Sequence, residues 1–380
     1  MKKIGYIIFF LAIPLLFALS VNASEIDGKI TSSLEDELAD FKNSLPDSVI
    51  DFLPENTLSG DYTQLLNGSI DEISFLELTA TYLTSGINVV LKSFASILIL
   101  IIIISVFNAM SSSVTNDGLK LAFSLCSCIC ITVTVFNICS VLVNNAAQYM
   151  SVLCTVMSAF IPIMTATLTM GGNITGAVVS NGSMLLFINL VESFLVSFML
   201  PLTKAALAFG CVKGLNSEID LGGISKSIKT AFTSVTVFVM SIFMFVLSYK
   251  NTLAQGADTI SIKTARFAIS SFVPLVGSSV NESLRTVTAS LSLIKSSCGI
   301  VAIISVAVLM LPIIINLFLN KLSFSLLATM SRAIGGNKEA AVLEEADSAC
   351  GFILTLVCCT CVLFIFALTI FIKTELGGTS

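Results

Sequence analysis

A run of 71 residues without a single Asp, Glu, Lys or Arg, from Leu121 to Val191, constrains this chain more than any other feature. A water-soluble core of ordinary size does not leave so long a segment uncharged, whereas two or three bilayer crossings of about 20 residues each fit into it. The composition agrees, because 55% of the residues are hydrophobic and only 11% are charged. We therefore expect an all-α fold, a polytopic bundle of membrane-spanning helices.

The N-terminus has the pattern of a secretory signal peptide. Lys2 and Lys3 precede an apolar run, and small residues, Val21 and Ala23, stand where a signal peptidase cuts. We expect residues 1–23 to be the signal peptide, and an uncleaved first membrane helix is the alternative. In either case residues 24–85, with 13 acidic and two basic residues, form a small helical segment outside the cytoplasm.

Seven apolar segments follow within residues 86–373, the expected membrane domain, and residues 374–380 form a short polar tail. The expected spans are 87–110, 121–143, 151–170, 184–203, 231–249, 299–319 and 350–372, with a turn at 171–183. A cleaved signal peptide would put the basic loop 250–298 in the cytoplasm, as the positive-inside rule demands, but the basic loop 204–230 would then break the rule. The topology after the first span therefore stays open. Residues 338–349 are expected to form a polar helical lead into the last span.

The residue types exclude several kinds of chemistry. The chain has no His, which removes imidazole acid–base catalysis and most imidazole metal sites, and it has no phosphate-binding glycine loop. Its 11 cysteines lie at or beyond Cys126, mostly inside expected spans, and are best interpreted as small buried hydrophobic residues. We expect no catalytic residue, no cofactor and no metal site, and no nucleic acid as a partner.

Glu192 is the strongest single candidate for a functional residue. It lies near the middle of the expected fourth span, where an acidic side chain costs about 3 kcal/mol and has to face the bundle interior or water. It could line a conduit or carry a proton. The structural alternative is a carboxyl group that is hydrogen-bonded to a neighbouring helix.

The stretch from Lys263 to Gly299 is too polar for a simple span and too apolar for a free loop. Pro274 and Gly277 interrupt helical pairing within an apolar patch, as in a re-entrant half-membrane element, although a surface amphipathic hairpin fits equally well. The candidate conduit or motif positions are Glu192, Lys263, Arg266, Pro274, Gly277, Glu282, Lys295 and Gly299.

The same stretch carries a family resemblance. Its core Phe272-Val273-Pro274-Leu275-Val276-Gly277, with the flanking residues named above, resembles the stage III sporulation protein AE family of endospore-forming bacteria. The layout of signal peptide, short polar segment and multi-span domain is similar over essentially the whole chain. Where family members often have Gly or Ala directly after this core, this chain has Ser278 and Ser279.

The resemblance implies a non-enzymatic part in endospore development. It implies a place in the mother-cell membrane around the forespore, in a channel or secretion-type complex with sister proteins that include an ATPase and ring-forming components. That complex would meet a forespore channel protein across the intermembrane space. The alternative function is a stand-alone secondary transporter of a small solute, with a path near Glu192 and Pro274.

Overall fold

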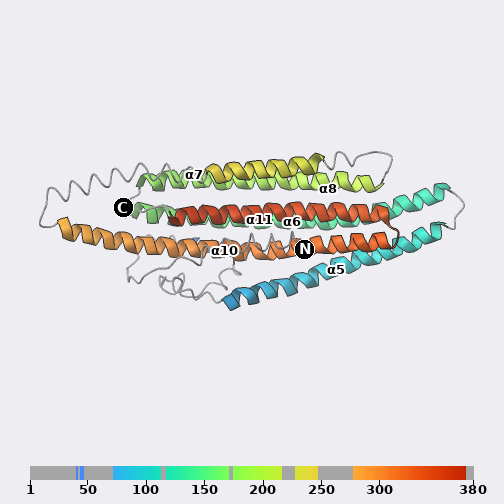
Figure 1. Ribbon diagram of the computed structural model, residues 1–380, viewed down its shortest axis with the longest axis horizontal. Coiled ribbons are helices and arrows are strands. Elements are labelled where there is room, and N and C mark those ends of the chain that lie inside the picture. The colour runs from blue at the N-terminus through green and yellow to red at the C-terminus, as the bar shows by residue number, and fades with distance from the viewer. Residues whose placement is uncertain are drawn as a thin grey trace.

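The chain folds into an elongated bundle of helices that run side by side along one axis (Figure 1). The computed structural model describes residues 40–41, 43–46, 72–112, 117–170, 174–215, 227–246 and 277–373. Within these residues there is no strand, and six helices are long and apolar enough to cross a membrane. The all-α membrane bundle is therefore confirmed, with six such helices where seven spans were expected.

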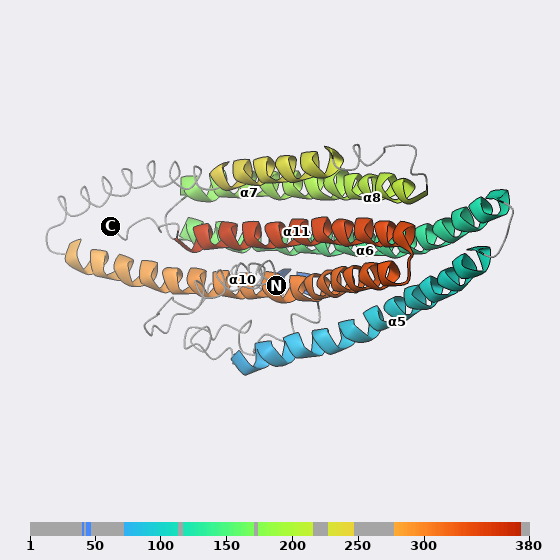
Figure 2. The same cartoon turned by 45° about the vertical axis from the view of Figure 1, so that its right-hand side comes forward.

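The passes alternate in direction, as the two views show together (Figures 1 and 2). The helices are α5 (Glu72–Ser112), α6 (Asp117–Met170), α7 (Ile174–Glu192), the π-helix η2 (Ser193–Met199), α8 (Leu200–Leu215), the helix Ser227–Val246, α10 (Gly277–Ala333) and α11 (Asn337–Lys373). Because α7, η2 and α8 follow one another without a break, they form a single pass.

The difference in count comes from α6. The expected second and third spans, 121–143 and 151–170, are parts of this one helix of 54 residues. The residues between them include Asn144 and Asn145 but neither Gly nor Pro, so nothing there stops a helix. The expected turn at 171–183 is also shorter than predicted, because α7 begins at Ile174 and contains Asn181 and Gly182.

The centre of the bundle is the pairing of α10 with α11, which contact each other more extensively than any other two labelled helices. In the most apolar part of α10, 83% of the residues are buried, against 22% in the most apolar part of α5. The two helices are joined by a tight turn in which Gly335 has a φ of +86°. The backbone N–H of Gly336 donates to the carbonyl of Ser331 at 2.9 Å, which closes the end of α10 as glycine commonly does.

Charged side chains divide this bundle along its axis. In α10 no charged residue occurs between Lys295 and Lys321, and in α11 none occurs between Asp347 and Lys373. Each of these stretches has 25 residues and is therefore about 37 Å long, close to the ~30 Å of a bilayer's hydrocarbon core. We call this part of the bundle the charge-free section, and the end that holds the Gly335 turn the turn end.

The other end of the bundle carries the described piece of the acidic segment. Phe41 and Leu45 are buried, and the ring of Phe41 lies 5.6 Å from that of Phe160 on α6, which in turn contacts Phe371 on α11. This part of the acidic segment therefore packs against the helical bundle. The expected division at residues 85 and 86 falls inside α5, and the division into separate domains stays a prediction.

Candidate functional site

Glu192 lies where the fourth pass changes its helical type. It is the last residue of α7, and the π-helix η2 begins at the next residue. The hydroxyl of Ser151 on α6 donates to Oε1 of Glu192 at 3.0 Å, and the glutamate is half-buried. This is the interhelical hydrogen bond that the structural alternative required. Short π-helices nevertheless occur often at functional sites, so the carboxyl group stays a candidate.

Lys295 and Gly299 lie one helical turn apart on α10, at the end of the charge-free section that is opposite the turn end. The side chain of Lys295 is buried, and its Nζ lies 5.2 Å from the centre of the Phe371 ring, a cation–π contact. A Cβ atom on Gly299 would collide with the side chain of Ile372, so only glycine lets α10 approach α11 so closely here. Both positions therefore secure the pairing of α10 with α11.

The structure does not assemble the other sequence-based candidates into a site. Lys263, Arg266 and Pro274 lie outside the described residues. Gly277 is the first residue of α10, and Glu282 lies in its first turns, where the backbone is described and the side chain is not. The described part of the supposed half-membrane element, from residue 277 on, is thus continuous helix. Glu192 lies at a different level from Lys295, because Ser151 and Phe160, which mark the two levels, are nine residues or about 13 Å apart on α6.

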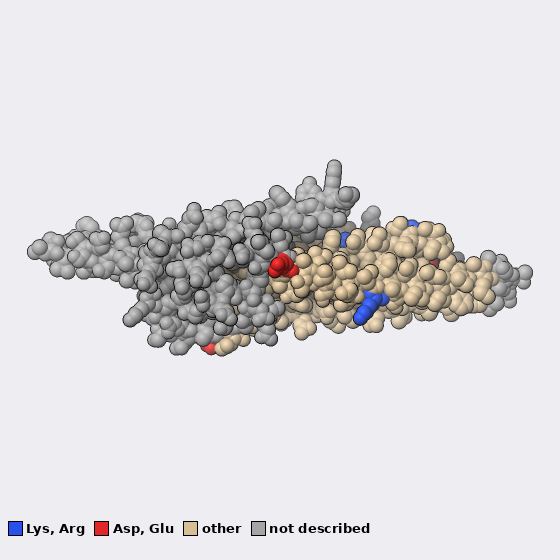
Figure 3. Space-filling model, turned by 90° about the horizontal axis from the view of Figure 1, so that it is seen from below, with Lys and Arg blue, Asp and Glu red and all other residues tan. Residues whose placement is uncertain are grey.

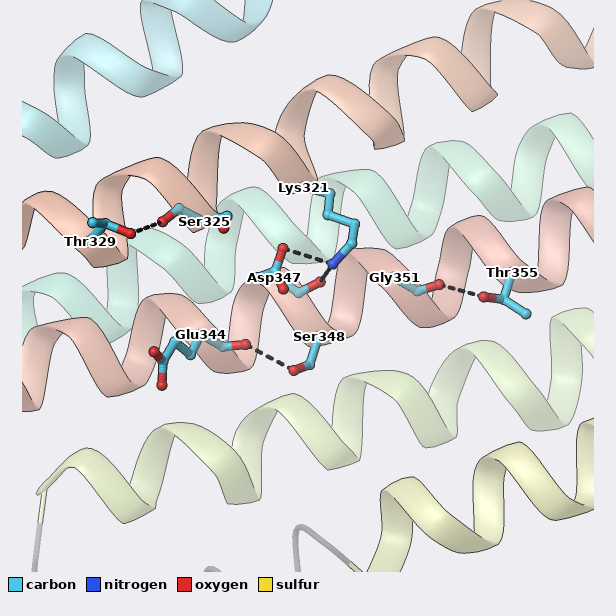
Figure 4. Close-up of polar contacts among 8 residues, drawn as sticks. All are labelled: Lys321, Ser325, Thr329, Glu344, Asp347, Ser348, Gly351 and Thr355. Atoms are coloured by element: carbon cyan, nitrogen blue, oxygen red, sulfur yellow. Dashed lines mark hydrogen bonds and ion pairs between the residues drawn. The ribbon is translucent and has the colours of Figure 1, made fainter. Parts of the chain in front are cut away.

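A second group of charges gathers near the turn end, and sequence analysis missed it. Three carboxylates on one stretch of α11 each bind a different base: Glu344 pairs with Arg332, Glu345 with Lys229 at 2.7 Å, and Asp347 with Lys321 at 2.8 Å. Figure 4 shows Lys321 of α10 reaching across to Asp347, while Glu344 faces another side of α11. We call these six residues the charged belt.

The charged belt joins helices that are distant in sequence. Lys229 belongs to the helix Ser227–Val246, and a Cβ atom on Gly210 of α8 would collide with the carboxylate of Glu345. Next to the belt, Nζ of Lys338 binds the hydroxyl of Ser124 on α6 at 3.0 Å. The sequence did show an acidic helical segment at 338–349, but not which bases it meets, because those bases come from other helices.

The Lys229–Glu345 pair is the most shielded of the three, since its side chains are 26% and 12% exposed. The Arg332–Glu344 pair is 57% and 45% exposed. A shielded pair is costly to break from one side because the remaining charge loses its partner in a poorly hydrated place. An exposed pair contributes little. Glu345 is therefore the part of the belt that fixes three helices together.

A groove of about 560 Å³ lies between the helix Ser227–Val246 and α11. Its walls are mainly apolar, and four of the lining residues carry hydroxyl groups: Thr233, Thr236, Ser241 and Thr355. Glu192 does not line this groove. Among the residues that the structure describes, no three His, Cys, Asp or Glu side chains could hold a metal ion together. All 11 cysteines are described and free, and seven of them are buried.

Comparison with known proteins points to one family. The family model described as stage III sporulation protein AE matches residues 62–375. Stage III sporulation protein AE of Bacillus subtilis (strain 168) is 21% identical over 355 residues, which cover 92% of this chain and 88% of that protein. No solved structure matches the chain.

We predict that Lys229→Met lowers the free energy of unfolding by about 2 kcal/mol, because the shielded carboxylate of Glu345 loses its cation. The matched control, Arg332→Met, removes an exposed pair and should cost less than about 1 kcal/mol. Thermal unfolding followed by circular dichroism in detergent measures both. Adding Glu345→Gln to Lys229→Met should recover part of the loss, and equal losses for the two single variants would contradict this interpretation.

Proposed function

The chain belongs to the stage III sporulation protein AE family, and from this premise we propose that it is a membrane component of a channel or secretion-type complex between mother cell and forespore. Its part is that of a non-enzymatic conduit or scaffold. The observation that carries the proposal is the family match over residues 62–375, which includes every helix of the bundle from α5 to α11.

The bundle supports a part of this kind. Its helices are apolar enough to lie in the mother-cell membrane, and its charged side chains are mostly engaged in holding helices together. The lack of His in the whole chain removes the commonest acid–base catalyst. The proposed partners are membrane lipid, sister stage III sporulation proteins that include a secretion-type ATPase and ring-forming components, and a forespore channel protein across the intermembrane space.

The transporter alternative gains no support from the site. Glu192 is hydrogen-bonded to Ser151, and the groove beside α11 is lined by other residues. A component of a larger assembly needs no complete solute path of its own.

The six passes suggest an orientation for the bundle. With the first pass entering from outside, after a signal peptide, the turn end faces the cytoplasm and residue 373 returns to the outside. In this orientation the loops and helix ends on the cytoplasmic side contain eight Lys and Arg residues. The outer side contains six, not counting those of the acidic segment. The basic 204–230 region, which broke the positive-inside rule with seven spans, obeys it with six. The same orientation puts the acidic segment outside, and it also moves the basic stretch 250–298, which seven spans would leave in the cytoplasm, to the outer side.

We predict that affinity-tagged protein from sporulating cells co-purifies with sister stage III sporulation proteins in mild detergent. The same tag on an unrelated membrane protein of similar abundance is the control. Quantitative mass spectrometry should find the sister proteins enriched at least tenfold over that control. Purification without them, combined with solute uptake by the pure protein in vesicles, would instead support the transporter.

We predict that Glu192→Gln lowers the yield of heat-resistant spores at least tenfold while the amount of protein stays normal. The amide can still accept the hydrogen bond from Ser151, but it can carry neither charge nor an exchangeable acidic proton. The control is Ser151→Ala, which removes the hydrogen bond and keeps the carboxyl group, and its yield should stay near normal. If Glu192→Gln sporulates normally, or if both variants fail alike, the carboxyl group has no role beyond structure.

We predict that alkaline phosphatase is active when fused after residue 380 and inactive when inserted after residue 220. The enzyme folds only outside the cytoplasm, so this pair of fusions separates six passes from seven. A green fluorescent protein fusion at the same two places should give the opposite pattern. Active phosphatase at residue 220 would overturn the orientation and leave the family assignment untouched.

A further inference from the structure

Polar side chains form a strip where α6 lies beside the pass made of α7, η2 and α8. The hydroxyl of Ser151 donates to Glu192 at 3.0 Å, and Nζ of Lys204 donates to Oδ1 of Asn144 at 2.8 Å. Two further polar residues lie between these contacts along their helices, one on α6 and one on η2. We call the six residues of this strip the polar face: Asn144, Gln148, Ser151, Glu192, Ser197 and Lys204.

The polar face lies on the outside of the bundle. Asn144, Gln148 and Ser197 are exposed, and the other three residues are half-buried. The three members on α6 follow one another at steps of four and three, so they share one side of that helix. Met150 and Leu153, on the opposite side of α6, are buried in the core. The strip is therefore turned away from the core of the bundle.

The depth of the polar face follows from the pairing of α6 with α11. The thiol groups of Cys139 and Cys350 hydrogen-bond to each other, and further along the same two helices Phe160 contacts Phe371. On each helix these two contacts are 21 residues apart, so α6 and α11 run in parallel along the charge-free section. Gln148 lies nine residues beyond Cys139 and twelve before Phe160. The polar face thus lies near the middle of the hydrocarbon core.

Lipid is a poor cover for such a surface. Hydrocarbon offers no hydrogen-bond partner to amide, hydroxyl or charged groups, so polar side chains at this depth face protein or water. The side of α5 is different, because its described surface is almost free of charged residues, as expected of a surface against lipid (Figure 3). The two sides of the bundle therefore face different surroundings.

We propose that the polar face is one wall of a water-filled passage across the membrane. This inference rests on the proposed function, because one face forms only one wall and other subunits of the complex have to complete the passage. The wall contains one acid and one base, and its other four side chains are amides and hydroxyl groups. Rings of like charge select ions of the opposite sign. A wall with balanced charge instead suits small uncharged solutes that form hydrogen bonds.

The test measures whether water reaches the polar face in membranes isolated from sporulating cells, where the complex stays assembled. A charged methanethiosulfonate reagent modifies thiol groups that water reaches. It should modify more than half of the molecules at Gln148→Cys and at Ser197→Cys. Mass spectrometry reads each labelled peptide separately, so the native cysteines remain in place.

Phe238→Cys is the matched control on a different helix. Phe238 is 67% exposed and lies two residues from Thr236, whose hydroxyl donates to the sulfur of Met199 at 3.7 Å. Met199 is in turn two residues from Ser197, so the control lies at nearly the same depth as the polar face. Because Phe238 belongs to an apolar surface, fewer than a tenth of the molecules should be modified there.

Equal modification at all three positions, or protection of both positions on the polar face, would overturn the proposal. The same membranes are also tested for co-purification of the sister sporulation proteins. Protection together with co-purification would refute the passage and leave the proposed function standing. Modification without co-purification would refute the proposed complex and leave the water contact of the polar face standing.

A second measurement replaces polar side chains by apolar ones. Against lipid, Gln148→Leu combined with Ser197→Leu would be harmless, whereas in a narrow passage the two leucines would expel water. We expect the yield of heat-resistant spores to fall at least tenfold while the amount of protein stays normal. Phe238→Leu is the control and should sporulate normally. Normal sporulation of the double variant would contradict the passage.

Discussion

The dry contact between α10 and α11 is the interaction on which the rest of the bundle depends. These two helices bury most of their apolar surface, and every other pass packs around them. Helices in lipid gain little from the hydrophobic effect when they associate, so close van der Waals packing has to hold them together. Gly299 permits such packing at one end of the pair, and Gly335 allows the sharp reversal at the other.

Charge is used sparingly and in places where it connects helices. The belt carboxylates follow one another on a short stretch of α11, yet they point to different neighbours, because successive helical residues are rotated by about 100°. A single polar segment thereby ties α11 to α10 and to the helix Ser227–Val246 at one end of the charge-free section. Lys295 plays a comparable part at the opposite end of that section, where its ammonium group lies over the ring of Phe371.

The fold class followed from the sequence because membrane helices leave a strong and simple signal. The uncharged run from Leu121 to Val191 indicated a chain that spans a membrane, and the family resemblance was confirmed. The number of passes was less secure. An uncharged run gives no sign of where one helix stops, and the division that was expected between residues 143 and 151 falls in the middle of α6.

The site could be predicted only in part, for a different reason. Glu192 stood out because it is the one charged residue of the expected span 184–203, and its neighbour Ser151 could not be identified without the register of α6 against α7. The belt pairs Lys229–Glu345 and Lys321–Asp347 join residues that are 116 and 26 positions apart. Such pairs depend on helix–helix register, which single-chain periodicity does not contain.

The π-helix after Glu192 determines where this pass tolerates a change in length. A π-helical turn accommodates one residue more than an α-helical turn. Deleting one residue between Ser193 and Met199 would therefore restore regular α-helix and keep α8 in its present phase relative to α7. Gly210 would stay opposite Glu345, and Lys204 would stay beside Asn144. The same deletion in a regular α-helical part of this pass would instead rotate every following residue by about 100°.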